Sequence, residues 1–243
     1  MSYWKQMPAR LVPAPGVVDI CRTSLSLPQT QVDIYRSLLS DTEARRAERF
    51  RGQAKSREYI ISRGLLRKVL GITLGCNPED IDFHYSAHDK PCLAAPKDEN
   101  DIRFNVSHSH EQTLIALTPS NDIGVDIEHL RTNLEFKKMA SRFFSVNEAD
   151  ELNTYTDLGI AQAFFACWTR KEAFVKALGE GIAFGLSEFS VSANPFVDEV
   201  RLVTHWDESF AGGWSIRNIN AGRDYVAAIA VAGKISRLRF WDV

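Results

Sequence analysis

The stretch Gly124-Val125-Asp126-Ile127-Glu128 is the part of the sequence from which the fold can be worked out. Its apolar residues alternate with acidic ones, which is the pattern of a β-strand with two different faces. A similar stretch, Gly16-Val17-Val18-Asp19-Ile20, follows a proline-rich lead, and Asp126 lies 107 positions after Asp19. The recurrence indicates that the chain contains two copies of one structural unit.

Each of these strands is followed by the signature of a capped helix. Ser40-Asp41-Thr42-Glu43 and Ser145-Val146-Asn147-Glu148 are capping boxes 105 positions apart. In a capping box the serine and the glutamate each satisfy a free backbone N–H group at the start of a helix. Apolar residues at helical spacing then predict long helices from about Lys55 to Leu70 and from about Leu158 to Leu178.

Short β-like runs follow each predicted long helix. They are Ile81–Tyr85, Ile102–Ser107 and Thr113–Leu117 in the first half, and Phe189–Ser192, Arg201–His205, Trp214–Ile219 and Tyr225–Val231 in the second. We therefore expect an α+β fold of two similar α+β halves, residues 1–118 and 119–243, joined at a turn-rich segment. A cleft between two such halves is a common place for a ligand.

The composition is that of a soluble globular protein. Of 243 residues, 44% are hydrophobic and 25% charged, which excludes intrinsic disorder and collagen-like repeats. With 29 basic and 31 acidic side chains the net charge is −2, which argues against coating of bulk nucleic acid. The segment Arg45–Lys68 nevertheless carries nine basic and two acidic residues, a local +7. This excess suggests a specific anionic ligand, and a solvated helix face is the alternative.

The cysteines and the hydropathy place the chain in the cytoplasm. None of the four cysteines has the Cys-x-x-Cys spacing of a zinc knuckle or dithiol motif, so we expect buried free thiols. No apolar run has the length of a signal peptide or of a transmembrane helix. We therefore expect a cytoplasmic protein without a membrane partner.

Asp126 and Glu128 are the first candidates for chemistry. They are two positions apart on the predicted strand, so both carboxylates lie on one face. Two such carboxylates repel each other unless a cation lies between them, and oxygen-only ligands suit Mg²⁺. A solvent-facing strand would carry the same pair without a metal.

Glu172 and Lys176 form a second candidate pair in the helical segment Trp168–Lys176. Four positions apart, they share a helix face and could simply form an ion pair. Most of the remaining helix is apolar, however, which suggests a partly buried cleft. In such a cleft the carboxylate could complete a metal site and the ammonium could face a phosphate.

Polar residues end the predicted strand Phe104–Ser109 and supply the third candidate group. His108 and Ser107 could donate to a phosphate, and plain surface polarity is the alternative. A zinc site on His108 and His110 lacks a Cys, Asp or Glu at a spacing that would complete it.

Together these segments resemble the Sfp-type (group II) 4′-phosphopantetheinyl transferases. The family's G-[IV]-D-[IV]-E strand matches Gly124–Glu128, and its W-x-x-K-E-[AS]-x-x-K helix matches Trp168–Lys176. Its K-P element, its F-N-[ILV]-S-H-S strand end and its F-F-S-x-x-E segment are also present, as Asp89-Lys90-Pro91, Phe104–Ser109 and Phe143–Glu148. The resemblance spans roughly residues 17–231, with five motifs in the family's order.

The resemblance implies two α+β halves related by a pseudo-twofold axis, with coenzyme A bound between them and Mg²⁺ on its pyrophosphate. The implied reaction moves 4′-phosphopantetheine from coenzyme A to a serine of an acyl or peptidyl carrier protein of fatty acid, polyketide or nonribosomal peptide biosynthesis. The implied metal ligands are Asp126, Glu128 and Glu172. Glu172 would also be a candidate base, directly or through a water. Phosphate contacts are implied for Lys176, His108, Ser107 and Lys90.

The 3′-phosphate of coenzyme A would meet the basic segment, with Arg46 and Arg63 as the expected contacts. This chain has Glu43 where some family members carry a lysine, and Asp89 in place of the family's usual glycine. The carrier would dock on the basic segment or on the stretch Leu130–Phe144. The resemblance also favours a monomer. A non-catalytic module that binds coenzyme A or a nucleotide is the alternative from another functional class.

Overall fold

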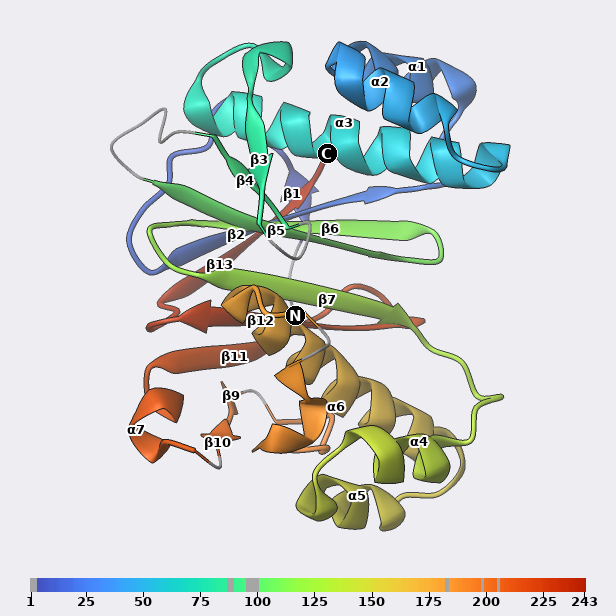
Figure 1. Cartoon of the computed structure of the whole chain (residues 1–243), viewed down its shortest axis with the longest axis vertical. Coiled ribbons are helices and arrows are strands. Elements are labelled where there is room, and N and C mark those ends of the chain that lie inside the picture. The colour runs from blue at the N-terminus through green and yellow to red at the C-terminus, as the bar shows by residue number, and fades with distance from the viewer. Residues whose placement is uncertain (1–3, 87–89, 95–100, 182–183, 198, 205) are drawn as a thin grey trace.

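The computed structural model describes residues 4–86, 90–94, 101–181, 184–197, 199–204 and 206–243. The chain forms four stacked layers, helix, sheet, sheet and helix, which run from top to bottom in Figure 1. One apolar core fills the space between each helical layer and its sheet, and a third core lies between the two sheets. The predicted α+β class is confirmed.

The first sheet lies beneath helices α1 (Gln29–Ser37), α2 (Asp41–Glu48) and α3 (Gln53–Leu74). Its strand order is β1-β13-β2-β6-β5. The strands are β1 (Lys5–Gln6), β2 (Val17–Ser24), β5 (Ile102–Ser109), β6 (Gln112–Pro119) and β13 (Arg237–Asp242). A short 3₁₀ turn (Pro78–Asp80) and a small hairpin of β3 (Phe83–Tyr85) and β4 (Pro91–Leu93) follow α3.

The second sheet has the order β7-β12-β11-β9 and packs against α6 (Asp157–Leu178). Its strands are β7 (Ile123–His129), β9 (Glu199–Val200), β11 (Trp214–Ile219) and β12 (Tyr225–Ala232). The remaining elements of this half are α4 (Phe136–Phe143), α5 (Val146–Asn153), a 3₁₀ turn (Leu186–Glu188), β8 (Phe189–Ser190), β10 (Val203–Thr204) and α7 (Glu208–Ala211). None of the helices in the described part of the chain combines the length and apolar character needed to cross a membrane.

The two halves repeat the same local chemistry. Ser40 and Glu43 form the predicted capping box of α2, and Ser145 and Glu148 form that of α5. Each buried glutamate also pairs with a buried cation of the following 22-residue helix. In the first half, the Nε of Arg67 from α3 lies 2.5 Å from the Glu43 carboxylate. In the second half, the Nζ of Lys171 from α6 lies 2.7 Å from the Glu148 carboxylate. The axis that would relate the halves stays a prediction.

The last strand of the chain crosses back to the first sheet. β13 pairs in parallel with β2, from Arg237 opposite Val17 to Asp242 opposite Arg22. The division at residue 118 assigns β13 to the second half, whereas the structure places it between β1 and β2. The physical reason is that β2 pairs with β6 on one side only, so its other edge needs a partner.

The edge strand β7 touches α6 through its backbone at Gly124. A Cβ atom at this position would lie 2.0 Å from the carbonyl oxygen of Ala173 and 2.5 Å from the amide nitrogen of Ala177. Only glycine allows two elements to approach so closely. The glycine that opens the Gly124–Glu128 strand therefore sets the distance between β7 and α6.

Candidate active site

Two edge strands, β5 of the first sheet and β7 of the second, lie side by side and are joined through side chains. The Oγ of Ser107 donates to Oδ1 of Asp126 at 2.9 Å, and the Oγ of Ser109 donates to Oε2 of Glu128 at 3.2 Å. Because both serines and both acids are two positions apart, every second residue of each strand faces this seam. The predicted carboxylates and the predicted Ser107 are therefore brought together.

Helix α6 brings an ammonium group to the same seam. The Nζ of Lys176 lies 2.6 Å from Oδ1 of Asp126 and donates to Oγ of Ser107 at 3.0 Å. The Asp126 side chain is buried, whereas 29% of the Lys176 side chain is exposed. The carboxylate is therefore shielded from solvent, whereas part of the lysine side chain remains accessible.

Glu172 lies one helical turn before Lys176 and adds a third carboxylate to Asp126 and Glu128. Burial and the negative charge of Asp126 raise the pKa of Glu172 above its usual value. The same two causes raise the pKa of Glu128. Oε1 of Glu172 and Oδ2 of Asp126 are buried without a hydrogen-bond partner. Mutual repulsion and two unpartnered oxygens are conditions that a hard cation would relieve.

The chain's own cations neutralise part of this charge. Lys176 pairs with Asp126, and Arg131 donates to Oε2 of Glu128 at 3.1 Å. Among the described residues, no three His, Cys, Asp or Glu side chains already have the spacing of a metal site. The donor set still fits Mg²⁺, because it consists of carboxylate oxygens, two of which lack any partner.

A cavity of about 250 Å³ lies against the other face of β5. Successive residues of a strand point to opposite faces, so Ser107 faces the carboxylates and His108 faces this cavity. Strand β5 is thus a wall shared by the carboxylate group and the cavity. The polar and aromatic lining consists of Arg46, Tyr59, Ser62, Arg63, Tyr85 and His108. Three of the predicted binding residues therefore meet here.

The two predicted arginines, Arg46 and Arg63, differ in their exposure and in whether their charge is already paired. The Nε of Arg63 lies 2.9 Å from Oε1 of Glu43, at an angle that leaves it without a hydrogen bond. Its guanidinium also donates to the Tyr85 hydroxyl, and the side chain is buried. Arg46 is exposed, with its guanidinium carbon 5.7 Å from the ring centre of Tyr59. Arg46 can meet an anion directly, whereas Arg63 is already engaged by Glu43, which it shares with Arg67.

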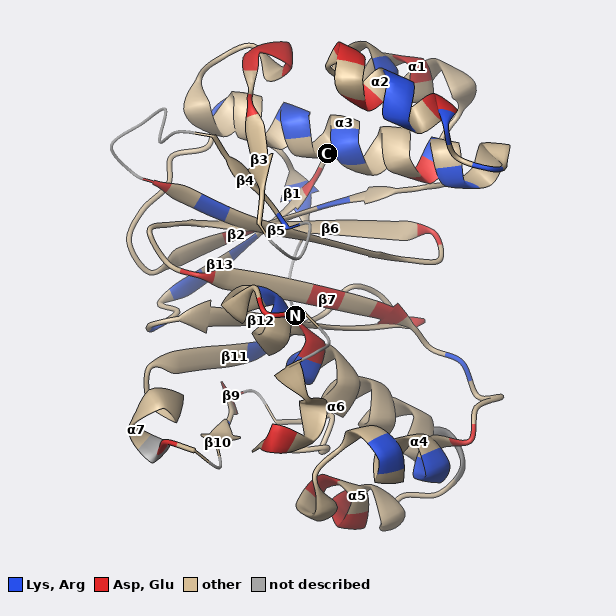
Figure 2. Ribbon diagram, viewed as in Figure 1, with Lys and Arg blue, Asp and Glu red and all other residues tan. Residues whose placement is uncertain are grey.

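The basic segment Arg45–Lys68 is divided between interior and surface. Arg67 pairs with Glu43 and donates to the carbonyl oxygen of Pro78 at 2.6 Å. Figure 2 shows basic residues on α2 and α3 and acidic residues along β7. Its exposed basic residues are Arg45, Arg46, Arg49, Arg51 and Lys55. The +7 counted from the sequence overstates the free charge, because Glu43 lies outside the segment, pairs with both Arg63 and Arg67, and offsets one of their two positive charges.

Lys90 reaches across to the second half. Its Nζ donates to the carbonyl oxygens of Lys176 at 2.7 Å, Ile123 at 3.3 Å and Ala177 at 3.4 Å. Burial lowers the pKa of this ammonium group. Asp89, which precedes it in the predicted Lys-Pro element, lies outside the described residues.

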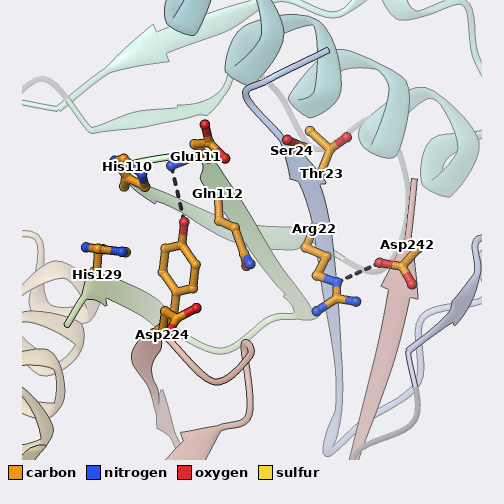
Figure 3. A pocket seen from close by; sticks show the side chains of 10 residues that line it. Arg22, Thr23, Ser24, His110, Glu111, Gln112, His129, Asp224 and Asp242 are labelled. Atoms are coloured by element: carbon orange, nitrogen blue, oxygen red, sulfur yellow. Dashed lines mark hydrogen bonds and ion pairs between the residues drawn. The ribbon is translucent and has the colours of Figure 1, made fainter.

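A cavity of about 470 Å³ lies at one end of the two-sheet stack and was not predicted. In Figure 3, Arg22 and Asp242 form one side of it and His110 and His129 the other. The ring centres of the two histidines are 4.5 Å apart. Its lining comes from the ends of strands far apart in the sequence, so no local motif marks it. Ser109 was missed as well, although its spacing of two from Ser107 could have indicated it.

Comparison with known proteins places this geometry in a family context. A family model described as the 4′-phosphopantetheinyl transferase superfamily matches residues 122–230. A second model, described as 4′-phosphopantetheinyl transferase, N-terminal, matches residues 27–120. The chain is 34% identical over 238 residues to the 4′-phosphopantetheinyl transferase HetI of Nostoc sp., and the alignment covers 98% of this chain and 97% of HetI.

Two further relatives extend the similarity to other groups of organisms. The 4′-phosphopantetheinyl transferase Sfp of Bacillus subtilis is 30% identical over 165 residues, which are 68% of this chain and 71% of Sfp. The L-aminoadipate-semialdehyde dehydrogenase-phosphopantetheinyl transferase of Xenopus laevis is 25% identical over 211 residues. That alignment covers 81% of this chain and 69% of the Xenopus protein.

Proposed function

The chain belongs to the 4′-phosphopantetheinyl transferase superfamily, and from this premise we propose that it moves 4′-phosphopantetheine from coenzyme A to a serine of an acyl or peptidyl carrier protein. The observation that carries the proposal is the seam at which Asp126, Lys176 and Glu172 meet beside Ser107. Because the relatives are named as transferases, membership of this family favours an enzyme over a non-catalytic binding module.

In the proposed reaction the serine oxygen forms a bond to the phosphorus atom that carries the pantetheine. The bond from that phosphorus to the bridging oxygen of the pyrophosphate breaks, and adenosine 3′,5′-bisphosphate leaves. The serine must lose its proton. Glu172 is the candidate acceptor, directly or through a water, because burial and neighbouring carboxylates raise its pKa above the usual value and so make it a stronger base.

Asp126, Glu128 and Glu172 are the residues that would hold Mg²⁺. When bound, this ion would supply positive charge to the pyrophosphate of coenzyme A. Lys176 is placed to add a second positive charge from α6, and His108 can donate a hydrogen bond from the face of β5 that lines the cavity. Ser107 is a further proposed phosphate contact, although its hydroxyl donates to Asp126 in this structure. Lys90 is left out of this group because its ammonium already donates to three carbonyl oxygens.

The cavity behind β5 is the proposed site of the nucleotide end of coenzyme A. Arg46 is exposed at its rim and supplies the free positive charge for the 3′-phosphate. Arg63 is the second proposed contact, although Glu43 holds it in an ion pair. Tyr59 and Tyr85 offer aromatic faces in the same cavity.

Two basic surfaces are candidates for the carrier protein, which we propose to be acidic around its serine. One is the exposed part of the segment Arg45–Lys55, and the other is α4, where Lys137, Lys138 and Arg142 are exposed. Charge of this kind would accelerate the encounter of enzyme and carrier. We further propose a cytoplasmic monomer, which suits four unpaired cysteines.

The direct test incubates the protein with coenzyme A, Mg²⁺ and an apo carrier protein and measures the carrier by mass spectrometry. We expect a mass gain of one phosphopantetheine and release of one adenosine 3′,5′-bisphosphate. A panel of fatty acid, polyketide and nonribosomal peptide carriers identifies the class of partner. Folded protein that modifies no member of this panel would contradict the proposal.

A further inference from the structure

Lys90 connects the two halves at the end of helix α6. It stands directly before β4 in the first half, and its three acceptors belong to the second half. Two of them, the carbonyl oxygens of Lys176 and Ala177, lie in the last turn of α6. Carbonyl groups in the last turn of a helix have no partner within the helix. Lys90 therefore satisfies oxygens that the helix itself leaves free.

The position also suits a positive charge. The C-terminal end of a helix carries partial negative charge, which attracts a cation placed against it. The carbonyl oxygen of Ile123, the first residue of β7, completes the set of acceptors. Lys90 thus binds the end of α6 and the beginning of β7 at the same time.

These contacts reach the proposed active site through Lys176. This residue gives its carbonyl oxygen to Lys90 at 2.7 Å and its ammonium to Asp126 at 2.6 Å. Asp126 in turn lies three positions after Ile123 on β7. At Gly124, between them, β7 and α6 touch without spare room. A small movement of the end of α6 would therefore change the distance between Lys176 and Asp126.

We propose that Lys90 is a positioning residue, which clamps the end of α6 and the start of β7 to the first half so that Lys176 and Asp126 stay together. The role differs from the phosphate contact that the family resemblance implies. It rests on the proposed transferase function for its kinetic readout only. The two roles make opposite predictions for the Michaelis constant of coenzyme A.

The experiment compares Lys90→Met with Arg103→Met, a matched control. Lys90 and Arg103 both line a third cavity of about 560 Å³ beside the end of α6, but Arg103 pairs with Asp101 at the surface. For Lys90→Met we expect kcat to fall at least about tenfold, because misplaced catalytic groups lose rate. The KM for coenzyme A should stay within about twofold, as it does when an interaction of the transition state is lost. Arg103→Met should change neither value. A rise in KM with unchanged kcat would overturn the clamp and assign the phosphate contact.

A second variant keeps the test decisive if Lys90→Met does not fold. Lys90→Gln loses the charge but keeps an N–H donor on a side chain that is one bond shorter. Under the clamp it retains more kcat than Lys90→Met at the same KM, whereas a phosphate contact would raise KM. A rise in KM in this variant overturns the clamp.

Amide hydrogen exchange tests the clamp without any activity. In Lys90→Met the amides in the last turn of α6 should exchange at least about tenfold faster than in the wild type, while Arg103→Met leaves them unchanged. Unchanged exchange in a folded Lys90→Met protein would overturn the clamp. The wild type could show no transfer activity while these amides still exchange faster in Lys90→Met. In that case the proposed function fails and the clamp stands.

Discussion

Ser107 and Asp126 are joined by a hydrogen bond of 2.9 Å that crosses from one half of the molecule to the other. Ser107 belongs to an edge strand of the first sheet and Asp126 to an edge strand of the second. The same Oδ1 of Asp126 accepts from Lys176 at 2.6 Å, so three elements meet at one oxygen atom. The proposed active site is therefore a product of how the two halves dock.

The first prediction concerns the carboxylates at this junction. Asp126→Ala and Glu172→Ala should each reduce transfer by at least about a hundredfold, because each removes negative charge proposed to hold the metal on the pyrophosphate. Circular dichroism should show an intact fold. Asp224→Ala is the control, since Asp224 is exposed and lies at the unrelated cavity. Near wild-type rates in either variant would show that the metal assignment is wrong.

The second prediction concerns pH and the protein without metal. Burial and Asp126 raise the pKa of Glu172 in the folded state above its ordinary 4.5. Between 4.5 and the raised value the folded state binds more protons than the unfolded state. The free energy of unfolding contributed by Glu172 therefore falls as pH rises through this window. Glu172→Gln should be more stable than the wild type at pH 7, and its stability should depend less on pH.

Urea denaturation between pH 4.5 and pH 7 measures this difference. Mg²⁺ provides the complementary observation, since a ligand of the folded state stabilises it by about 2.7 kcal/mol at a hundred times its Kd. The wild type should gain this stability and Glu172→Gln should gain less. A variant that is less stable than the wild type at pH 7 without metal would mean that Glu172 is not under electrostatic strain.

Features of the structure can be predicted from the sequence when the residues that determine them lie close together along the chain. The capping boxes at Ser40 and Ser145 and the long helices were predictable, because their signals lie within one or a few turns. The seam was predictable in part, since Asp126 and Glu128 had to share a strand face. The crossing of β13 was not, because the partners Arg22 and Asp242 are 220 positions apart.

The state of Arg63 could not be predicted either. A count of charges along Arg45–Lys68 treats every arginine as available. In the structure Glu43, twenty positions before Arg63, pairs with it and with Arg67 at once and offsets one of their two positive charges. Lys90 likewise binds carbonyl oxygens of Lys176 and Ala177, which no charge pattern could reveal. Backbone acceptors leave no trace in the sequence, so the partners of buried cations are known only from the fold.

The third prediction follows from the difference between the two arginines of the cavity. Arg46→Ala should raise the KM for coenzyme A about tenfold, because an exposed arginine is proposed to pair with the 3′-phosphate. The KM for 3′-dephospho-coenzyme A should stay the same. Arg45→Ala, at an exposed neighbouring position, serves as the control. If the KM values for both substrates rise equally in Arg46→Ala, this residue does not bind the 3′-phosphate.

The fourth prediction concerns the buried pair of Lys171 and Glu148, whose side chains are 0% and 1% exposed. Lys171→Met leaves the Glu148 carboxylate buried without its cation, which should lower the free energy of unfolding by about 3–5 kcal/mol. Lys138→Met is the control, since its ion pair with Glu135 is largely exposed and should be worth less than about 1 kcal/mol. Chemical denaturation measures both. Similar losses in the two variants would contradict a structural role for the buried pair.

The last prediction concerns the contact that sets β7 against α6. Gly124→Ala places a Cβ atom 2.0 Å from the carbonyl oxygen of Ala173, so strand and helix must separate. We expect a loss of about 3 kcal/mol or more, since overpacking against backbone cannot be relieved by a side-chain rotation. Transfer activity should fall further than the loss of folded protein explains, because Lys176 moves away from Asp126.

Gly159→Ala in α6 is the matched control, because a Cβ atom there would have its nearest neighbour at 3.6 Å. It should stabilise the protein by about 0.5–1 kcal/mol, because alanine restricts the unfolded chain. Equal effects of the two substitutions would show that β7 and α6 are not held at this distance by Gly124.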